Sequence, residues 1–286
     1  MTTASEIAPT GWRSRLSRWR FVTLSGAAIL LLITLAALSA GLIWPAGPWV
    51  QVAEPLIPPF VRADLPLGTD GLGRNVAAML VYGARVSLLI GIASTAAATL
   101  LGILIGAVAG YVRGVVDDLL MRFTEIFQTI PSFMFVIVLM VIFTPTVYTI
   151  TLAIAIVSWP PAARLVRGEF MTLSKREFVQ SCRLIGMHPA RIIFTEILPN
   201  CLSSVVVIAS VMVASAVLIE AGLSFLGLGD PNIVSWGGMV AQGKPMIRSA
   251  AYLSIVPGLA IFVLVLCINI VGEGLNDRLN PRLRRR

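Results

Sequence analysis

The sequence is poor in charge. Asp, Glu, Lys and Arg make up 13% of its 286 residues, whereas an average soluble domain has about 25%. A water-soluble fold of this length needs more polar surface than that, so the composition excludes a soluble enzyme, a disordered chain and a soluble all-β domain. What the sequence has instead is apolar, since 57% of its residues are hydrophobic. It therefore predicts a polytopic membrane protein.

The chain also lacks the residues of most catalytic sites. It has one histidine, His188, and three cysteines, Cys182, Cys201 and Cys267, whose spacing fits no metal site and which fall in no predicted outer loop. Neither a G-x-x-x-x-G-K-[ST] phosphate loop nor a G-x-S-x-G nucleophile elbow occurs. We therefore expect no catalytic residue, no metal, no disulfide and no directly bound cofactor. Any energy for uphill transport would come from elsewhere.

Long uncharged stretches predict membrane-spanning helices, which need about 20 apolar residues each. The stretch between Glu125 and Arg164 holds 38 uncharged residues, enough for two spans joined by a turn at Thr144-Pro145-Thr146. The first apolar run exceeds the h-region of a signal peptide and is interpreted as an uncleaved anchor. The sequence thus predicts an all-α fold with six transmembrane helices at 21–44, 86–110, 125–143, 147–166, 201–221 and 251–271.

Basic residues are unequally distributed between alternate segments. With the N-terminus inside, 17 of the 22 Lys and Arg residues fall on the inner side and 5 on the outer side. The positive-inside rule therefore predicts that both termini are cytoplasmic. The expected order is a basic tail 1–20, the anchor, an external segment 45–81, a core 82–275 with a cytoplasmic loop 167–200 and an external loop 222–250, and a basic tail 276–286. The Arg-rich end is interpreted as a topology anchor, not as a nucleic-acid site.

Ionisable residues in the middle of a span would suggest a proton relay, and here they are nearly absent. Glu125 and Glu220 fall near the predicted helix ends, within reach of water or headgroups. This disfavours a proton-coupled carrier. An autonomous channel or secondary carrier and a membrane scaffold without transport activity remain as alternatives.

Gly102, Gly106 and Gly110 recur at four-residue spacing in the predicted helix 86–110. Small residues in this register let helices approach closely. We expect a packing stripe, either inside the chain or against a partner subunit.

The long inner loop predicts two short helices. Over 174–186, Phe178, Cys182 and Ile185 recur on one face, and Gly186 is a suitable stop. A second helix would start at Pro189 and end before Pro199. The residues alone leave two interpretations open: an amphipathic helix lying on the membrane interface and a docking helix for a cytoplasmic partner.

Several motifs, in order, resemble those of one family. Residues 180–186 (Gln-Ser-Cys-Arg-Leu-Ile-Gly), followed by Leu198-Pro199, resemble the EAA loop of ABC-importer permeases. Gln180, Ser181 and Cys182 replace the Glu-Ala-Ala of that loop. The segment 66–75 (Pro-Leu-Gly-Thr-Asp-Gly-Leu-Gly-Arg-Asn) resembles the C-type subunit of dipeptide, oligopeptide and nickel importers. Further matches to this subfamily lie at 82–88, 163–169, 220–229, 235–237 and 269–281.

The resemblance implies a type I importer architecture in a bacterial inner membrane. It implies four partners: a B-type permease subunit, two ATP-binding subunits that hold ATP and Mg²⁺, and an extracytoplasmic solute-binding protein. The segment 174–199 would couple to the ATP-binding subunits through Phe178, Gln180, Ser181, Cys182, Arg183, Gly186, Leu198 and Pro199. External contacts would involve Gly68, Asp70, Gly73, Arg74, Asp230 and Trp236. No residue chooses between peptides, nickel complexes and other small solutes.

Overall fold

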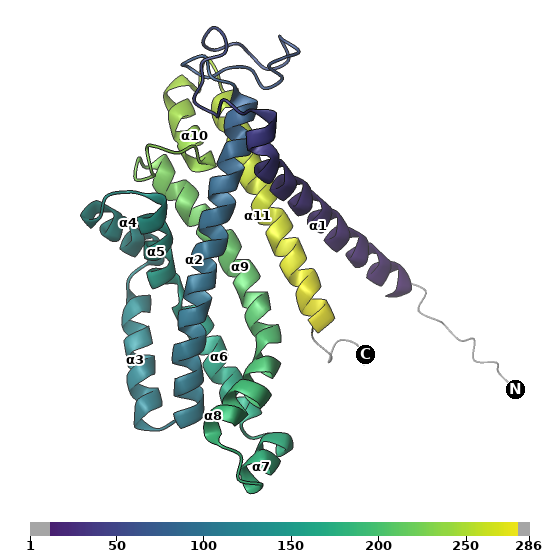
Figure 1. Ribbon diagram of the computed structural model, residues 1–286, viewed down its shortest axis with the longest axis vertical. Coiled ribbons are helices and arrows are strands. Elements are labelled where there is room, and N and C mark those ends of the chain that lie inside the picture. The colour runs from purple at the N-terminus through teal and green to yellow at the C-terminus, as the bar shows by residue number, and fades with distance from the viewer. Residues whose placement is uncertain (1–11, 280–286) are drawn as a thin grey trace, which may run out of the picture.

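The structure, a computed structural model, describes residues 12–279 and is helical over most of this range (Figure 1). Within the described residues the only β-type pairing consists of isolated bridges. The predicted basic tails lie largely outside the described residues. The helices are α1 Trp12–Ile43, α2 Val76–Val112, α3 Val115–Thr129, α4 Ser132–Ile142, α5 Val147–Ser158, α6 Pro160–Leu173, α7 Glu177–Leu184, α8 Pro189–Arg191, a π-helical turn Ile192–Ile197, α9 Leu198–Phe225, α10 Trp236–Gly243, a 3-10 turn Lys244–Met246 and α11 Tyr252–Leu279.

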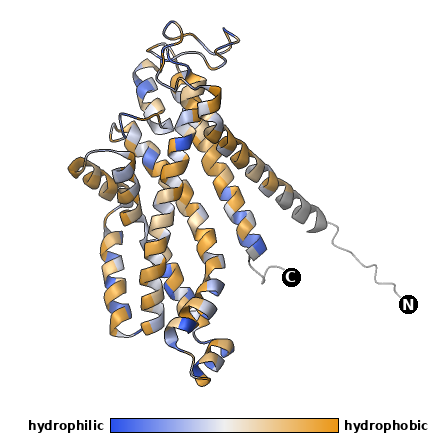
Figure 2. Ribbon diagram, in the orientation of Figure 1, coloured by the Kyte–Doolittle hydropathy of each residue, from blue (hydrophilic) through white to orange (hydrophobic). Residues whose placement is uncertain are grey.

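Among residues 12–279, four helices are long and apolar enough to cross a membrane, and the number rises to six if each of two bent helix pairs is one span. The four are Phe21–Ile43, Val76–Val112, Pro189–Phe225 and Tyr252–Arg278. Apolar residues dominate the long helices in Figure 2, as a lipid-covered surface requires. The architecture is therefore that of an all-helical polytopic membrane protein.

The predicted helix 125–143 differs most from the structure. The chain instead forms α3 and α4, which meet at an angle of 81°. The break lies at Ile130, which has extended dihedrals (φ −93°, ψ 127°) before Pro131. Proline lacks the N–H of a helical hydrogen bond and disfavours a helical residue before it.

Two other predicted helices also differ in their course. The predicted 147–166 is divided into α5 and α6, which meet at 43° near Trp159, just before Pro160-Pro161. Helix α2 starts ten residues before the predicted 86, because Asn75 caps it: Asn75 Oδ1 accepts the N–H groups of Ala77 and Ala78 (2.9 and 3.3 Å). The predicted start at 86 is too late because the uncharged stretch begins after Arg85, and Arg85 lies inside the helix.

The sequence predicts that the second inner helix ends before Pro199, and this prediction is wrong. Helical structure runs without a gap from Pro189 to Phe225. The π-helical turn lies just before the proline, and there the Leu198 N–H bonds to the carbonyl of Ile193, five residues back. This wider turn changes the hydrogen-bond register ahead of Pro199, so the loop passes directly into the membrane helix.

Helix α2 is the central element and packs against α1, α5, α6 and α9. Its closest approach is to α6, where the glycine stripe lies. A Cβ atom at Gly102 would overlap Ala162, one at Gly106 would overlap the carbonyl oxygen of Ala163, and one at Gly110 would overlap Phe170. The three glycines thus face another helix of the same chain.

We predict that Gly106→Val destabilises the subunit, because the new Cβ must displace backbone atoms of α6. Overpacking of this kind costs about 1–3 kcal/mol or more. The matched control is Gly168→Ala on α6, where an added Cβ meets no atom within 4 Å and a small gain in helix propensity is expected. Thermal unfolding in detergent measures both, and equal melting temperatures for the two variants would contradict the packing argument.

Candidate functional site

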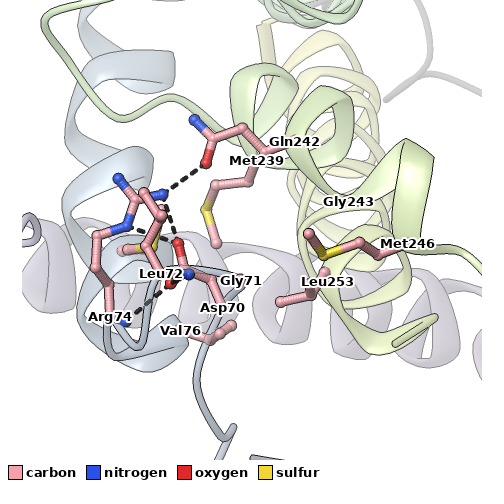
Figure 3. Close-up of a pocket in the computed structure, with 11 residues that line it drawn as sticks. Asp70, Gly71, Leu72, Arg74, Val76, Met239, Gln242, Gly243, Met246 and Leu253 are labelled. Atoms are coloured by element: carbon pink, nitrogen blue, oxygen red, sulfur yellow. Dashed lines mark hydrogen bonds and ion pairs between the residues drawn. The ribbon is translucent and has the colours of Figure 1, made fainter. Parts of the chain in front are cut away.

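The motif at 66–75 folds into a compact hydrogen-bonded loop, named the knot, at the start of α2, the end of the bundle that the sequence predicts to be the outer one. Asp70 Oδ1 accepts the backbone N–H groups of Leu72 and Arg74 (2.9 and 2.8 Å), and Asp70 Oδ2 accepts from Arg74 Nε at 2.6 Å. Both side chains are about nine-tenths buried. Figure 3 shows this ion pair beside Gln242, whose Oε1 accepts from Arg74 Nη2 at 3.0 Å. The pair fixes the loop's shape and joins it to α10.

Two glycines let the preceding chain lie directly against this knot. Gly68 and Gly73 have φ values of +74° and +76°, and a Cβ on either would overlap a backbone carbonyl, that of Ile57 or of Ala53. Tyr252 at the start of α11 closes the assembly by donating its hydroxyl to the Thr69 carbonyl (2.6 Å). The external segment after Ala53 is therefore held in place by backbone contacts.

Asp230 and Trp236 hold the second outer loop. Asp230 Oδ2 accepts the N–H of Val147 at the start of α5 (3.1 Å). Trp236 is 2% exposed and donates from Nε1 to the carbonyl of Leu80 on α2 (2.7 Å). The six residues proposed as external contacts are thus buried or half-buried. These six residues therefore support the surface and form little of it. Exposed apolar side chains nearby include Leu72, within the motif at 66–75 but not among the six, and Phe60 and Val61, which lie outside the motif.

The sequence predicts that water or lipid headgroups reach Glu220, and this prediction is wrong. Helix α9 continues to Phe225, and the Glu220 side chain points into the protein with 1% of its surface exposed. Its carboxyl oxygens accept hydrogen bonds from Ser224 Oγ (2.8 Å) and from Ser87 Oγ on α2 (3.3 Å). A buried polar group needs such partners, and here they tie α9 to α2.

The inner loop presents α7 at the far end of the bundle (Figure 1). The predicted apolar face was Phe178, Cys182 and Ile185, and of these the structure exposes Phe178 and Ile185 and half-buries Cys182. The buried residue of α7 is Val179. Phe178, Leu184 and Ile185 are 40%, 87% and 76% exposed. Val179 packs in an apolar cluster with Phe170 and Ile192. Helix α7 is therefore anchored by one face and offers apolar side chains on the other.

Gly186 ends α7 in a left-handed conformation, with φ +77°. The Gly186 N–H bonds to the carbonyl of Arg183 and the Met187 N–H to that of Cys182, both at 3.0 Å. This is the hydrogen-bond pattern of a Schellman cap, which favours glycine. A Cβ at Gly186 would meet no atom within 4 Å, so the constraint comes from the backbone angle alone.

The remaining residues proposed for coupling lie around this cap. Arg183 stacks over the ring of Tyr111 at 5.5 Å from its centroid, which joins α7 to the end of α2. Gln180 and Ser181 are exposed and bond locally to the carbonyls of Lys175 and Glu177. Leu198 is half-buried and Pro199 exposed, both at the start of α9.

Polar contacts unite the inner ends of the helices. Arg167 on α6 pairs with Asp117 on α3 (Nη2 to Oδ2, 2.7 Å). Arg113, just after α2, donates to Ser174 Oγ at 2.6 Å. Ser204 on α9 donates to Glu169 on α6 at 2.7 Å. A displacement of α7 would consequently act on a connected body rather than on one helix.

No cluster of three or more His, Cys, Asp and Glu side chains that could hold a metal ion occurs among residues 12–279. The arrangement instead has two surfaces at opposite ends of long apolar helices, an outer one built on the knot and an inner one built on α7.

Comparison with known proteins gives the family. Residues 102–285, more than half of the chain, match the model of the binding-protein-dependent transport system inner membrane component. The chain is 38% identical to the di/tripeptide transport system permease protein DppC of Pseudomonas aeruginosa (strain UCBPP-PA14), with 91% of this chain and 88% of the relative covered. It is 33% identical to the oligopeptide transport system permease protein OppC of Bacillus subtilis (strain 168), with 96% and 90% covered.

The same fold occurs in a solved structure. A chain of the MetNI methionine ABC transporter in an inward-facing conformation has a TM-score of 0.59 at 17% identity, with 71% of this chain and 96% of that chain covered. The protein belongs to the family of binding-protein-dependent transport system inner membrane components. It is a multi-pass inner-membrane permease subunit of a binding-protein-dependent ABC importer.

We predict that Arg74→Ala loosens the external segment, because it leaves the buried Asp70 carboxylate without its partner. Removing one member of a buried pair costs about 3–5 kcal/mol. The unfolding temperature and the rate of proteolytic cleavage within 45–75 measure the effect.

The matched control is Arg62→Ala in the same segment. Arg62 donates two hydrogen bonds to the exposed Asp64, and these hold the pKa of Asp64 below its usual value. Exposed pairs contribute little to stability, so we expect no measurable change. A cleavage rate for Arg74→Ala as slow as that of this control would show that the buried pair does not hold the segment.

Proposed function

We propose that this chain forms half of the translocation pathway of an ATP-driven importer of peptides or similar small solutes. In this proposal the segment 174–199 is the coupling element. The observation that carries it is α7, a short helix at one end of the bundle. Its Val179 packs with Phe170 and Ile192, and the apolar side chains of Phe178, Leu184 and Ile185 are exposed. An apolar helix face of this kind fits a groove on a partner protein.

The packing of α7 favours docking over the alternative of a helix lying on the membrane. Val179 fixes α7 to the inner ends of α6 and the π-helical turn, and Leu184 and Ile185 project from its last turn and cap. A partner that binds these side chains would move α6 and α9 together. The membrane helices would then rock as bodies, as alternating access requires.

The proposed partners follow from what this chain lacks. It has no phosphate loop, so ATP and Mg²⁺ would bind to two separate ATP-binding subunits, which would hydrolyse the ATP. A second, B-type permease subunit would complete the pathway. An extracytoplasmic solute-binding protein would deliver the solute to the outer surface around 45–75 and α10.

The proposed orientation places α7 and both termini in the cytoplasm. It rests on the 17 basic residues that fall on that side against 5 on the other. The proposed substrate class rests on relatives whose names specify dipeptide and oligopeptide transport.

We predict that Phe178→Asp and Gly186→Leu each reduce ATP-driven uptake at least tenfold while the complex still assembles. The Asp places a charge on the apolar docking face. The Leu forces a side chain into a left-handed conformation, at about 1–2 kcal/mol, with no steric clash to unfold the membrane part. Uptake and ATP hydrolysis by the whole complex in proteoliposomes, with its solute-binding protein, measure the coupling.

Gly186→Asn is the matched control, because Asn tolerates the left-handed conformation and should retain most of the uptake. Normal uptake by both Phe178→Asp and Gly186→Leu would contradict the assignment of 174–199 as the coupling element.

A further inference from the structure

A cavity of about 310 Å³ lies at the outer end of the protein, between its two outer segments. One wall is the knot that carries Asp70 and Arg74, and the other is formed by α10 and the 3-10 turn that follows it. Figure 3 shows Met239 and Met246 reaching from the second wall toward the first. The cavity thus exists only because two segments more than 150 residues apart in the sequence meet here.

The polar groups in the cavity are already paired with one another. Arg74 binds Asp70 and also donates to Gln242 across the gap between the walls (3.0 Å). The surface left for a guest is mainly apolar, and three of the lining side chains are methionines: Met79, Met239 and Met246. Methionine is flexible and polarisable, and it is common at surfaces that adapt to a guest side chain.

Gly71 shapes the cavity on the side of the knot. An added Cβ there would lie 2.7 Å from Cε and 3.2 Å from Sδ of Met246. The thioether end of Met246 therefore rests directly on the backbone of the knot. Because that end is flexible, a guest can displace it without moving the backbone.

The rim beside Met246 is basic. Lys244 and Arg248 lie two residues to either side of Met246 and are exposed. No Asp or Glu oxygen of the described part of the chain lies within 4 Å of either cation. The Lys244 ammonium lies over the ring of Phe225. A guest with carboxylates beside an apolar side chain would complement this rim.

We propose that this cavity binds one apolar side chain of the solute-binding protein, flanked there by acidic residues. The proposal rests on the proposed function, because it names the partner that the outer surface receives. The volume is at the lower end of the range for ligand pockets, about 300–1,000 Å³, so it suits a single side chain better than a peptide. A side chain anchored in a central pocket is the usual form of an interface hot spot.

The test uses the full complex in nanodiscs and a solute-binding protein from the same organism. Met246→Trp fills the cavity from its flexible side and should raise the Kd for that protein at least tenfold, with basal ATP hydrolysis unchanged. Gly71→Ala, which only pushes the end of Met246, should raise the Kd less. Arg248→Glu should weaken binding most at low salt. Val61→Trp, exposed on the same outer segment but not lining the cavity, is the control and should raise the Kd less than Met246→Trp does.

A crosslink identifies the guest directly. Leu72→p-benzoylphenylalanine, at the exposed edge of the cavity, should give on illumination a covalent product with the solute-binding protein. A product with lipid, with the transported solute or with another subunit would overturn the proposal. So would an unchanged Kd for Met246→Trp, or an equal loss for Val61→Trp.

The experiment distinguishes failure of the cavity proposal from failure of the proposed function. If the wild-type complex binds the solute-binding protein and imports solute while Met246→Trp binds equally well, only the proposed role of the cavity is excluded. If the wild-type complex binds no solute-binding protein, the proposed function fails as well.

Discussion

Close contact between α2 and α6, which Gly102, Gly106 and Gly110 permit, is the constraint on which the rest of the structure depends. Helix α2 has 37 residues and is therefore about 55 Å long. It starts in the outer knot and ends beside the inner loop. Because α2 has no side chain at the three glycines, α6 lies directly against its inner half. The inner ends of α3, α6 and α9 thus become one body attached to this rod. The outer and inner surfaces thus share a single rigid element.

The class of protein and most of its spans could be predicted from the sequence, because apolar runs of membrane length are rare in other folds. The courses of the helices could not be predicted by counting charges. Arg85 lies within α2, and Pro131 bends a run that carries no charge at all. In both cases a local signal was present, the Asn75 cap and the proline itself. Hydrogen bonding decided the boundary there, and hydrophobicity did not.

The roles of individual site residues were harder to predict than their place. The motif at 66–75 marked the outer surface, but a sequence cannot tell whether a charged pair faces a partner or its own backbone. In the structure Asp70 and Arg74 satisfy each other inside the knot. On α7 the buried contact is made by Val179, next to Phe178, which belongs to the predicted apolar face and is exposed. Apolar residues occur at adjacent positions of this short helix, so periodicity alone does not tell which of them is buried.

The π-helical turn Ile192–Ile197 determines the rotational phase between the inner loop and the membrane helix that follows. One residue of an α-helix turns the chain by about 100°, and a π turn holds one more residue than an α turn. The extra residue therefore fixes the direction in which Val179 and the cap at Gly186 point relative to Ser204 and Glu220 on α9. The angle at which α7 is presented therefore depends on the number of residues in this turn as much as on side-chain packing.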